Sequence, residues 1–309
     1  MCMIDSRNEW DPLEAIIVGS ATHANWPTTD PVFAEESTKT AWHKTPVPSG
    51  PVPQSIVDQA NRELDILSET LVRRGVTVYR PRPQDFVATH GMYNYCPRDR
   101  LLIYKDTVVD VNMMYPCRNQ EIQNYERLLS TARTVLTMPR DSHMILDAAN
   151  VCRLGNTWLF LESASGNRAA YDWLCAQFPE VTIELCNFYA GVHIDSTIVP
   201  LREGLVMLNA SRVNTDNCPQ ALRDWQKIWV TDDMIVPQSF WQYPYASKWI
   251  AMNMLVLDPE TVIADAAQTQ LITLLRQHGI DTIPLTLSHS RTLGGGFHCV
   301  TLDTRRRHD

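Results

Sequence analysis

The sequence predicts an α/β protein built from repeated ββαβ units. In four stretches, a strand-like run, a short polar turn and a second strand-like run precede a helix-compatible segment and a further strand. These stretches recur about 40 to 50 residues apart. A fifth unit can be assembled from the two ends of the chain, so we predict five units that close head to tail into a ring. An ordinary α/β sheet with hairpins is the alternative.

The first two units share a two-residue turn inside a strand-rich run. From Leu101, "LLIYKDTVVDV" turns at 105–106, and "NQEIQNYERLLSTA" and "RTVLTMP" supply the helix and the last strand. From Asn150, "NVCRLGNTWLFLES" turns at 155–156, followed by "GNRAAYDWLCAQF" and "EVTIELCNF". Val, Ile, Leu and Thr fill the runs, whereas Gly, Asn and Asp mark the turns, as hairpins require.

The third and fourth units follow the same order. From Ser196, "STIVPLREGLVMLNASRV" turns at 202–204, with "CPQALRDWQKI" as the helix and "DDMIVP" as the last strand. From Met252, "MNMLVLDPETVIADA" turns at 258–260, and "QTQLITLLRQHG" and "DTIPLTL" complete the unit. In this last helix, Leu271, Leu274 and Leu275 have the three-and-four spacing of a buried helical face.

The fifth unit combines the two ends of the chain. "HCVTLDTRR" supplies one strand, and "LEAIIVGS", the long helix "QSIVDQANRELDILSETLVRRG" and "VTVYRPR" supply the rest. A closed ring has no free edge, which is a physical reason for joining the ends there. Residues 21–49 interrupt this unit with several prolines, and we interpret them as a long loop or lid.

Composition argues against nucleic-acid-binding, membrane-spanning and secreted classes of protein. The chain has 309 residues, is 44% hydrophobic and 20% charged, and carries a formal net charge of −8. Arginines cluster only at 305–307, which argues against a nucleic-acid partner. No apolar run approaches the ~20 residues of a membrane span, and no secretory signal is evident. The eight cysteines lack CxxC spacing, so we expect a cytoplasmic protein without a zinc framework.

Polar residues recur where each unit begins. They stand in "NYCPRDR", "ILDAAN", "GVHIDST", "YASKW" and "GGGFHC", and they are Asp99, Asp147, His193, Asp195, Ser247 and Cys299. Equivalent points of a ring face the same axis, so we expect these side chains to converge on one central pocket. Taken singly, each has a plainer interpretation: His193 as a core histidine, Asp147 as a helix cap, the glycines as a bulge, and Arg212 as a surface arginine.

The residue types indicate covalent chemistry on a planar cation. A thiol needs a partner to become a thiolate, and a histidine can supply it. His193 and Asp195 lie two apart on a segment expected to be extended, so both should face one side. His298 is adjacent to Cys299 and should point away from it, which makes it the poorer candidate. Several carboxylates in one pocket suit a guanidinium, whose fork of donors two carboxylates can hold.

These motifs also carry a family resemblance. The chain resembles the arginine:glycine amidinotransferase family of the pentein superfamily over nearly its whole length. "NEWDPLEAIIVGSA" is similar to the family's opening strand, and "PRD", "DAA", "HIDST" and "SKWIAMNMLVLD" to its internal motifs. The most specific match is "LGGGFHCVTLDTRRR", from Leu293 to Arg307.

The resemblance implies a five-bladed α/β propeller, one catalytic domain over residues 1–309, and no metal or organic cofactor. It implies that Cys299 is the nucleophile, His193 the general acid and base, and Asp147 the carboxylate bonded to that histidine. The remaining positions match substrate-binding residues of the family: Asp99 and Asp195 as the guanidinium clamp, Arg212 near the substrate carboxylate, and Ser247 as a pocket hydroxyl.

The implied reaction is a ping-pong transfer of an amidino group from L-arginine to an acceptor amine, with release of ornithine. The rivals are hydrolysis of the guanidino group, as in a deiminase or dihydrolase, and a non-catalytic guanidine-binding protein. The family's typical Asn-Pro-Met before the histidine is replaced by Ala190, Gly191 and Val192. We therefore expect a small-molecule acceptor bulkier than glycine, and we regard a homodimer as compatible with these features.

Overall fold

The strands form several small sheets rather than one continuous sheet. The computed structural model describes residues 4–39, 47–140, 142–189, 191 and 193–308. Within these residues lie five three-stranded sheets and one two-stranded sheet, with helices between them in a mixed α/β fold. The prediction of an α/β protein is confirmed. The described residues form no closed sheet, and each sheet keeps its own edge strands. The expectation that closing the ring removes all free strand edges is therefore wrong.

Four of the sheets correspond to the four internal units. In each, an antiparallel hairpin is followed by a third strand parallel to the second. The turns suit this geometry: Gly155 and Gly204 adopt φ of 76° and 78°, where a Cβ would cause strain. The strands are β5 (Leu101–Tyr104), β6 (Thr107–Asp110), β7 (Thr134–Thr137), β8 (Val151–Leu154), β9 (Thr157–Leu161), β10 (Thr182–Cys186), β11 (Ile198–Arg202), β12 (Leu205–Asn209), β13 (Gln226–Val230), β14 (Leu255–Asp258), β15 (Thr261–Asp265) and β16 (Asp281–Leu285).

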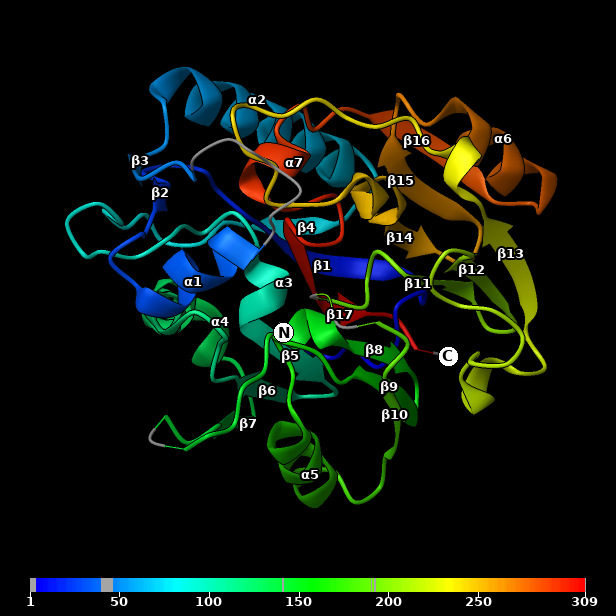
Figure 1. Cartoon of the computed structure of the whole chain (residues 1–309). Helices are drawn as coiled ribbons and strands as arrows, with labels where there is room; N and C mark the ends of the chain where they lie inside the picture. The colour runs from blue at the N-terminus through cyan, green and yellow to red at the C-terminus, as the bar shows by residue number, and fades with distance from the viewer. Residues whose placement is uncertain (1–3, 40–46, 141, 190, 192, 309) are drawn as a thin grey trace.

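The fifth three-stranded sheet joins the two ends of the chain, as predicted. Its order is β17 (Thr301–Arg306), β1 (Leu13–Val18) and β4 (Thr77–Tyr79), and Figure 1 shows β1 and β17 side by side. The long helix α2 (Gln54–Arg73) connects β1 to β4. Its buried face packs into the same apolar cluster as β1 through Ile56, Val57, Ala60, Leu64, Leu67 and Leu71.

The other crossover segments differ in how helical they are. The second and fourth units use α5 (Arg168–Gln177) and α6 (Thr269–Gln277), and the Asn167 side chain caps α5 by accepting from the Ala170 N–H. The first unit has the 3-10 helix η1 (Pro116–Tyr125) and one turn of α-helix, α4 (Glu126–Leu129).

The third unit corrects the sequence prediction. The segment expected to be a helix forms only the 3-10 turn η3 (Gln220–Leu222), and the last strand is β13. The segment expected to be that strand begins with η4 (Asp232–Met234). The physical reason is the alternation in "QKIWV", where Ile228 and Val230 are buried and the intervening residues are less so.

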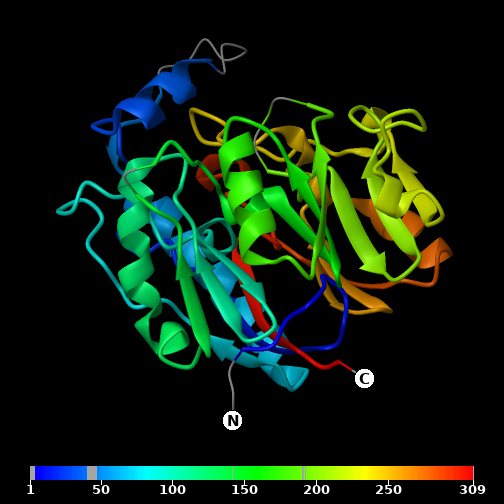
Figure 2. The same cartoon turned by 90° about the horizontal axis from the view of Figure 1, so that it is seen from below.

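The described residues of the predicted loop 21–49 contain regular structure. Strands β2 (Asn25–Trp26) and β3 (Gly50–Pro51) pair antiparallel, and α1 (Pro31–Lys39) lies between them. The Asp30 carboxylate accepts from the backbone N–H groups of Val32 and Phe33, which starts the helix. Figure 2 shows α1 at the periphery of the molecule. Residues 40–46, part of the predicted lid, lie outside the described residues.

Buried apolar clusters link each three-stranded sheet to the next. There are five such clusters among the described residues, each contains residues from two neighbouring sheets, and the sheets follow one another in cyclic order. One member from each sheet is named for each cluster: Ile17 and Leu101, Leu102 and Val151, Cys152 and Ile198, Val199 and Val256, and Leu255 and Ile16. Short helical segments precede the first strands of several sheets: α3 (Pro97–Arg100), η2 (Ala148–Asn150), η5 (Lys248–Met252) and α7 (Ser290–Leu293). These segments position the site described below.

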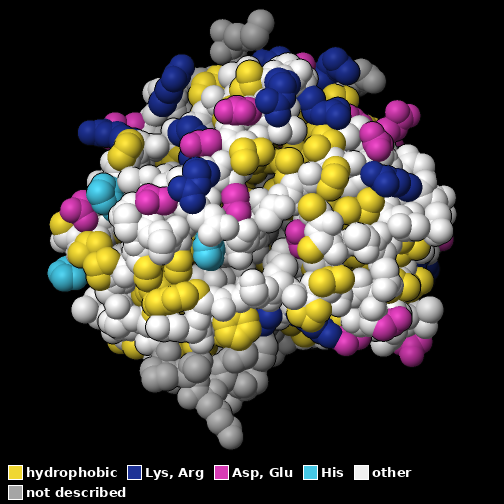
Figure 3. Space-filling view, turned by 90° about the horizontal axis from the view of Figure 1, so that it is seen from above, with side chains coloured by type: hydrophobic (Ala, Val, Ile, Leu, Met, Phe, Trp, Pro, Cys, Tyr) yellow, Lys and Arg dark blue, Asp and Glu magenta, His cyan; other side chains and the backbone are white. Residues whose placement is uncertain are grey.

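The surface carries no single field of charge on the face drawn in Figure 3. Basic and acidic side chains are interspersed there with apolar ones. Among the described helices, none combines the length and the apolar composition needed to cross a bilayer.

Candidate active site

Five of the predicted site residues line one pocket. They are His193, Asp195, Arg212, Ser247 and Cys299, and the pocket is open to solvent. Asp99 and Asp147 complete the set, because both carboxylates face His193. The structure therefore brings together all seven side chains that the sequence singled out.

Cys299 is fixed by the glycine run that precedes it. Gly294 ends α7 with φ of 82°, and a side chain at Gly295 would collide with Cys96. The Cys299 N–H donates to Asn253 Oδ1 at 3.0 Å, and its Sγ lies 3.2 Å from Asp195 Oδ2. Burial, together with Asp195 and Asp99, raises the pKa of the Cys299 thiol well above its ordinary value. Without a bound cation, the thiol is therefore protonated.

His193 lies between two carboxylates. Its Nε2 is 3.0 Å from Asp147 Oδ2, and its Nδ1 is 3.8 Å from Asp99 Oδ1. Burial disfavours the charged ring, but Asp99 and the hydrogen bond to Asp147 outweigh it and raise the pKa of His193 to about 9. Near neutral pH the ring is an imidazolium and can act as an acid.

The backbone at His193 differs from the expected extended segment. Its φ is 58°, in the left-handed region, and β11 begins only at Ile198. The Ile194 N–H donates to Ala149 O, which ties this turn to η2 beside Asp147. The prediction that His193 and Asp195 face one side because of strand alternation is wrong in its reason, although both line the pocket.

Asp99 is buried and only half satisfied. Its Oδ2 accepts from Arg118 Nη1 at 2.8 Å, whereas its Oδ1 has no hydrogen-bond partner. Burial raises the pKa of Asp99, although His193 and Arg118 oppose that change. Arg118 also pairs with Glu121 at 2.9 Å, so its charge is shared. Sequence reasoning missed Arg118, because "YPCRNQ" lies inside the first unit, away from the unit starts where site residues were sought, and carries no spacing signal.

Asp195 has a partner that sequence reasoning set aside. His298 Nδ1 lies 2.8 Å from Asp195 Oδ2, so this histidine faces the site. The expectation that it points away from Cys299 assumed a strand, but β17 begins only at Thr301 and residues 297–300 form a turn. Burial favours the neutral acid, but the hydrogen bond from His298 outweighs it and lowers the pKa of Asp195 to about 2.

Arg212 and Ser247 lie on the pocket wall. Arg212 Nη1 donates to Thr197 Oγ1 at 2.7 Å, and its guanidinium lies 4.3 Å from the centre of the Tyr189 ring. Ser247 caps η5, and its Oγ accepts from the Trp249 N–H. Of the three residues before His193, Gly191 lines the pocket, and a Cβ there would meet the Tyr189 ring at 2.6 Å. Ala190 and Val192 lie outside the described residues.

The same groups could be considered for a metal. Donor atoms of Asp99, His193 and Cys299 lie within 4.8 Å of one another. However, a metal would have to displace a proton from His193 and from the Cys299 thiol, whose pKa values are both raised, and this opposes its binding near neutral pH. The donor chemistry therefore favours proton transfer over metal ligation, and we identify none of the three as a metal ligand.

Comparison with known proteins identifies the family. Inosamine-phosphate amidinotransferase 1 from Streptomyces griseus is 40% identical over 99% of this chain and 98% of that protein. The chain belongs to the amidinotransferases. Its fold agrees: the solved structure of the Streptomyces griseus enzyme superposes with a TM-score of 0.88 at 37% identity, covering 100% of this chain and 98% of that one. No family model matches the sequence.

More distant amidinotransferases and pentein proteins extend the comparison. Mitochondrial glycine amidinotransferase from Gallus gallus is 28% identical over 99% of this chain and 83% of that protein. DDAH from Pseudomonas aeruginosa superposes with a TM-score of 0.68 over 94% of this chain and 99% of that one. At 14% identity this second likeness shows the fold alone. The predicted membership of the amidinotransferase family is confirmed.

Proposed function

We propose that this amidinotransferase moves the amidino group of L-arginine to an acceptor amine through a covalent intermediate on Cys299, and releases ornithine. The observation that carries the proposal is the pairing of a thiol with an imidazolium and two carboxylates around one pocket. A binding protein would need the carboxylates but neither the thiol nor the acid.

The donor's guanidinium fits the unsatisfied acceptors of the pocket. Asp99 Oδ1 lacks a partner, and Asp195 is ionised, so the two carboxylates can take N–H groups of the planar cation. Arg212 can hold the α-carboxylate of arginine, as the family resemblance implies. The cation also lowers the pKa of the nearby Cys299 thiol, because an opposite charge favours the ionised form. The thiol then releases its proton to solvent.

The two half-reactions follow from these charges. The Cys299 thiolate attacks the guanidinium carbon, and the bond from that carbon to the ornithine nitrogen breaks. His193 gives its proton to the departing nitrogen and becomes neutral. The acceptor amine then attacks the amidino carbon, His193 takes the proton that the amine loses, and the carbon–sulfur bond breaks to release the new guanidine.

Intact-mass spectrometry of the protein after it is mixed with L-arginine would test this proposal. A stoichiometric amidino adduct on Cys299, with ornithine released in equal amount, is the expected result. Cys299→Ala should remain folded and form no adduct, and Cys218→Ala, at a half-buried thiol outside the pocket, should behave as the wild type. An adduct on another cysteine, or citrulline or urea as the product, would contradict the proposal.

We propose further that the acceptor is bulkier than glycine. The greater identity to an enzyme named for inosamine phosphate than to one named for glycine supports this choice, as does the absence of a side chain at Gly191 beside the pocket. Shape discrimination of this kind gives about 10- to 200-fold. In a panel of amines assayed by ornithine release, an aminocyclitol phosphate should exceed glycine in kcat/KM. A highest value for glycine would contradict this choice.

For the architecture, we propose that the five three-stranded sheets are the blades of a propeller. Support comes from the cyclic order of the apolar clusters, in which each sheet packs against the next and the sheet made of both termini packs against the first and the fourth. A propeller would place the segments that precede the first strands around one axis, where the proposed catalytic groups lie.

A further inference from the structure

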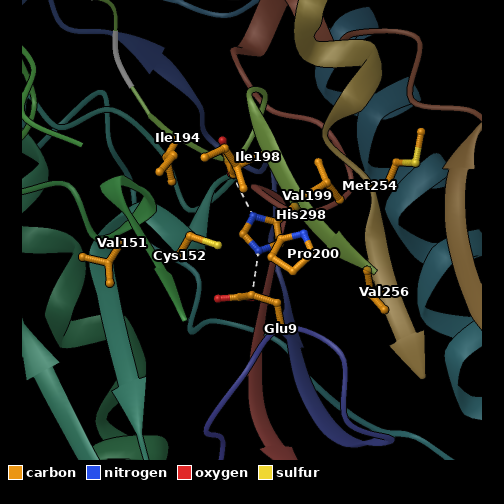
Figure 4. A pocket seen from close by; sticks show the side chains of 11 residues that line it. Glu9, Val151, Cys152, Ile194, Ile198, Val199, Pro200, Met254, Val256 and His298 are labelled. Atoms are coloured by element: carbon orange, nitrogen blue, oxygen red, sulfur yellow. Dashed lines mark hydrogen bonds and ion pairs between the residues drawn. The ribbon is translucent and has the colours of Figure 1, made fainter. Parts of the chain in front are cut away.

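A second cavity lies on the other side of Asp195. It is small, and Asp195 lines both this cavity and the substrate pocket. Its walls are mainly apolar and include Val151, Ile198, Met254 and Val256. Figure 4 shows the ring of His298 within this cavity, with Glu9 on one side of it. His298 and Glu9 have no part in the reaction proposed above.

Both ring nitrogens of His298 face carboxylates. Nδ1 lies 2.8 Å from Asp195 Oδ2, and Nε2 lies 3.3 Å from Glu9 Oε2. An ionised carboxylate can only accept, so each nitrogen must carry a proton for both contacts to be hydrogen bonds. The ring is then an imidazolium, and the pKa of His298 is raised by the hydrogen bonds to Asp195 and Glu9, against burial and Arg98.

Glu9 is held in place independently of His298. Its Oε1 accepts from Arg153 Nε at 3.0 Å, and its Oε2 from Arg153 Nη2 at 3.2 Å. Glu9 also accepts from the Arg153 backbone N–H, and Arg98 lies 3.8 Å away. These contacts join the N-terminal segment to β8, so the carboxylate that faces His298 Nε2 has little freedom to turn.

Asp195 Oδ2 receives two donors. His298 Nδ1 approaches it from the second cavity, and Cys299 Sγ approaches it at 3.2 Å from the substrate side. Asn253 braces this contact by accepting from the Cys299 N–H and donating to Asp195 O at 3.5 Å. The charged and titratable groups that act on the Asp195–His298 pair are Glu9, Arg98, His193 and Cys299.

We propose that His298, anchored by Glu9, is a positioning residue that keeps Asp195 ionised and directed at Cys299 and the substrate guanidinium. The proposal rests on the proposed function for the identity of that cation. In the apolar surroundings of the second cavity, a cationic donor stabilises the anion more than it would in water. Asp195 therefore stays available as a guanidinium acceptor and does not keep the proton that leaves the thiol.

Two amide variants test the hydrogen bonds of His298 Nδ1 and Nε2 separately. In His298→Asn the short amide can donate from near the Nδ1 position toward Asp195, whereas in His298→Gln the longer amide reaches toward Glu9. A charge-assisted hydrogen bond typically corresponds to about 10- to 150-fold in rate. We expect kcat/KM for adduct formation to fall within this range in His298→Gln and by a smaller factor in His298→Asn. His289→Asn, at a histidine that faces Gln59, is the matched control and should be unchanged.

The pH dependence of kcat/KM would not change if the role of His298 were purely structural. Without the imidazolium, the pKa of Asp195 should rise, so the acid limb of kcat/KM should move to higher pH in both variants and in Glu9→Gln. An unmoved acid limb in folded variants, or equal losses in His298→Asn and His298→Gln, would overturn the proposal.

A measurement on the wild type keeps the test independent of activity and of variant folding. In ¹⁵N-histidine-labelled protein, the two ring-nitrogen signals that disappear in His298→Asn are assigned to His298. Both should show imidazolium shifts near neutral pH. A neutral ring there would overturn the proposal. If the wild type instead shows an imidazolium but forms no amidino adduct, the proposed function fails and the pairing of His298 with Asp195 stands.

Discussion

At the scale of single residues, the site depends on where each proton resides. In the substrate-free pocket Cys299 is neutral, because burial and the carboxylates raise the pKa of its thiol. His193 is charged, because the carboxylates outweigh burial there. The proposed reaction needs the charged His193 as its acid but needs Cys299 as a thiolate, so only the cysteine must change its protonation state. In the proposed reaction, a bound guanidinium supplies this change by favouring the thiolate while leaving His193 protonated. Recognition of the donor and activation of the nucleophile are then one event.

The pH dependence of adduct formation tests this account of His193. The pKa of His193 is raised to about 9, so the acid is fully protonated below that pH and is lost as the pH rises through it. Single-turnover adduct formation at saturating arginine should therefore decline through pH 9. In Asp147→Asn the histidine loses an anionic partner, and the decline should begin at lower pH. Asp172→Asn, at an exposed carboxylate on α5, should leave the profile in place. An identical profile for Asp147→Asn would exclude His193 as the acid.

At the scale of elements, the glycine run between α7 and β17 positions Cys299, the proposed nucleophile. Gly295 passes close to Cys96 and Gly296 passes close to Asn253, and a Cβ at either position would displace its neighbour. The sequence predicted the four hairpins, because short polar turns between apolar runs leave a clear pattern. It did not predict the direction of His298, because that depends on where a turn becomes a strand. It also misplaced β13, where helix-compatible residues preceded a short alternating strand.

Gly296→Ala tests the role of this turn. A Cβ at this position would lie 2.8 Å from Asn253 Oδ1 and 3.0 Å from its backbone oxygen, so Asn253 must move. Asn253 holds the Cys299 N–H, and we expect a loss of about 1 to 3 kcal/mol in unfolding free energy. Adduct formation should slow by about 10- to 100-fold, since the sulfur is displaced.

Gly204→Ala is the control, because its φ of 78° also strains an alanine, yet a Cβ there meets nothing. That variant should lose stability and keep its rate. A normal rate for Gly296→Ala would show that the turn tolerates displacement of Asn253.

At the scale of the whole molecule, buried charges join the two ends of the chain to its first two units. Asp303 on β17 pairs with Arg98, with Arg153 on β8 and with Arg306. Glu9 pairs with Arg153 from the N-terminal segment. The sequence predicted that the ends meet in one sheet, because each end alone lacks strands to complete a unit. It gave no sign of this charge network, since the partners are far apart in sequence and have no common spacing.

Asp303→Asn tests how far the molecule depends on that network. The carboxylate is fully buried, and its removal leaves the guanidiniums of Arg98, Arg153 and Arg306 without their shared anion. Loss of one partner of a buried ion pair costs about 3 to 5 kcal/mol, which urea unfolding would measure as a lower midpoint.

The pKa of Asp303 is lowered well below its ordinary value, chiefly by Arg153 and Arg98 against burial. Its contribution is therefore present above the carboxyl range and is lost as the pH falls, so the difference between wild type and Asp303→Asn should shrink in acid. Asp172→Asn removes an exposed pair with Arg168 and should change stability by about 0.5 kcal/mol or less. Equal unfolding midpoints for Asp303→Asn and the wild type at neutral pH would mean that the apolar clusters alone hold the ends together.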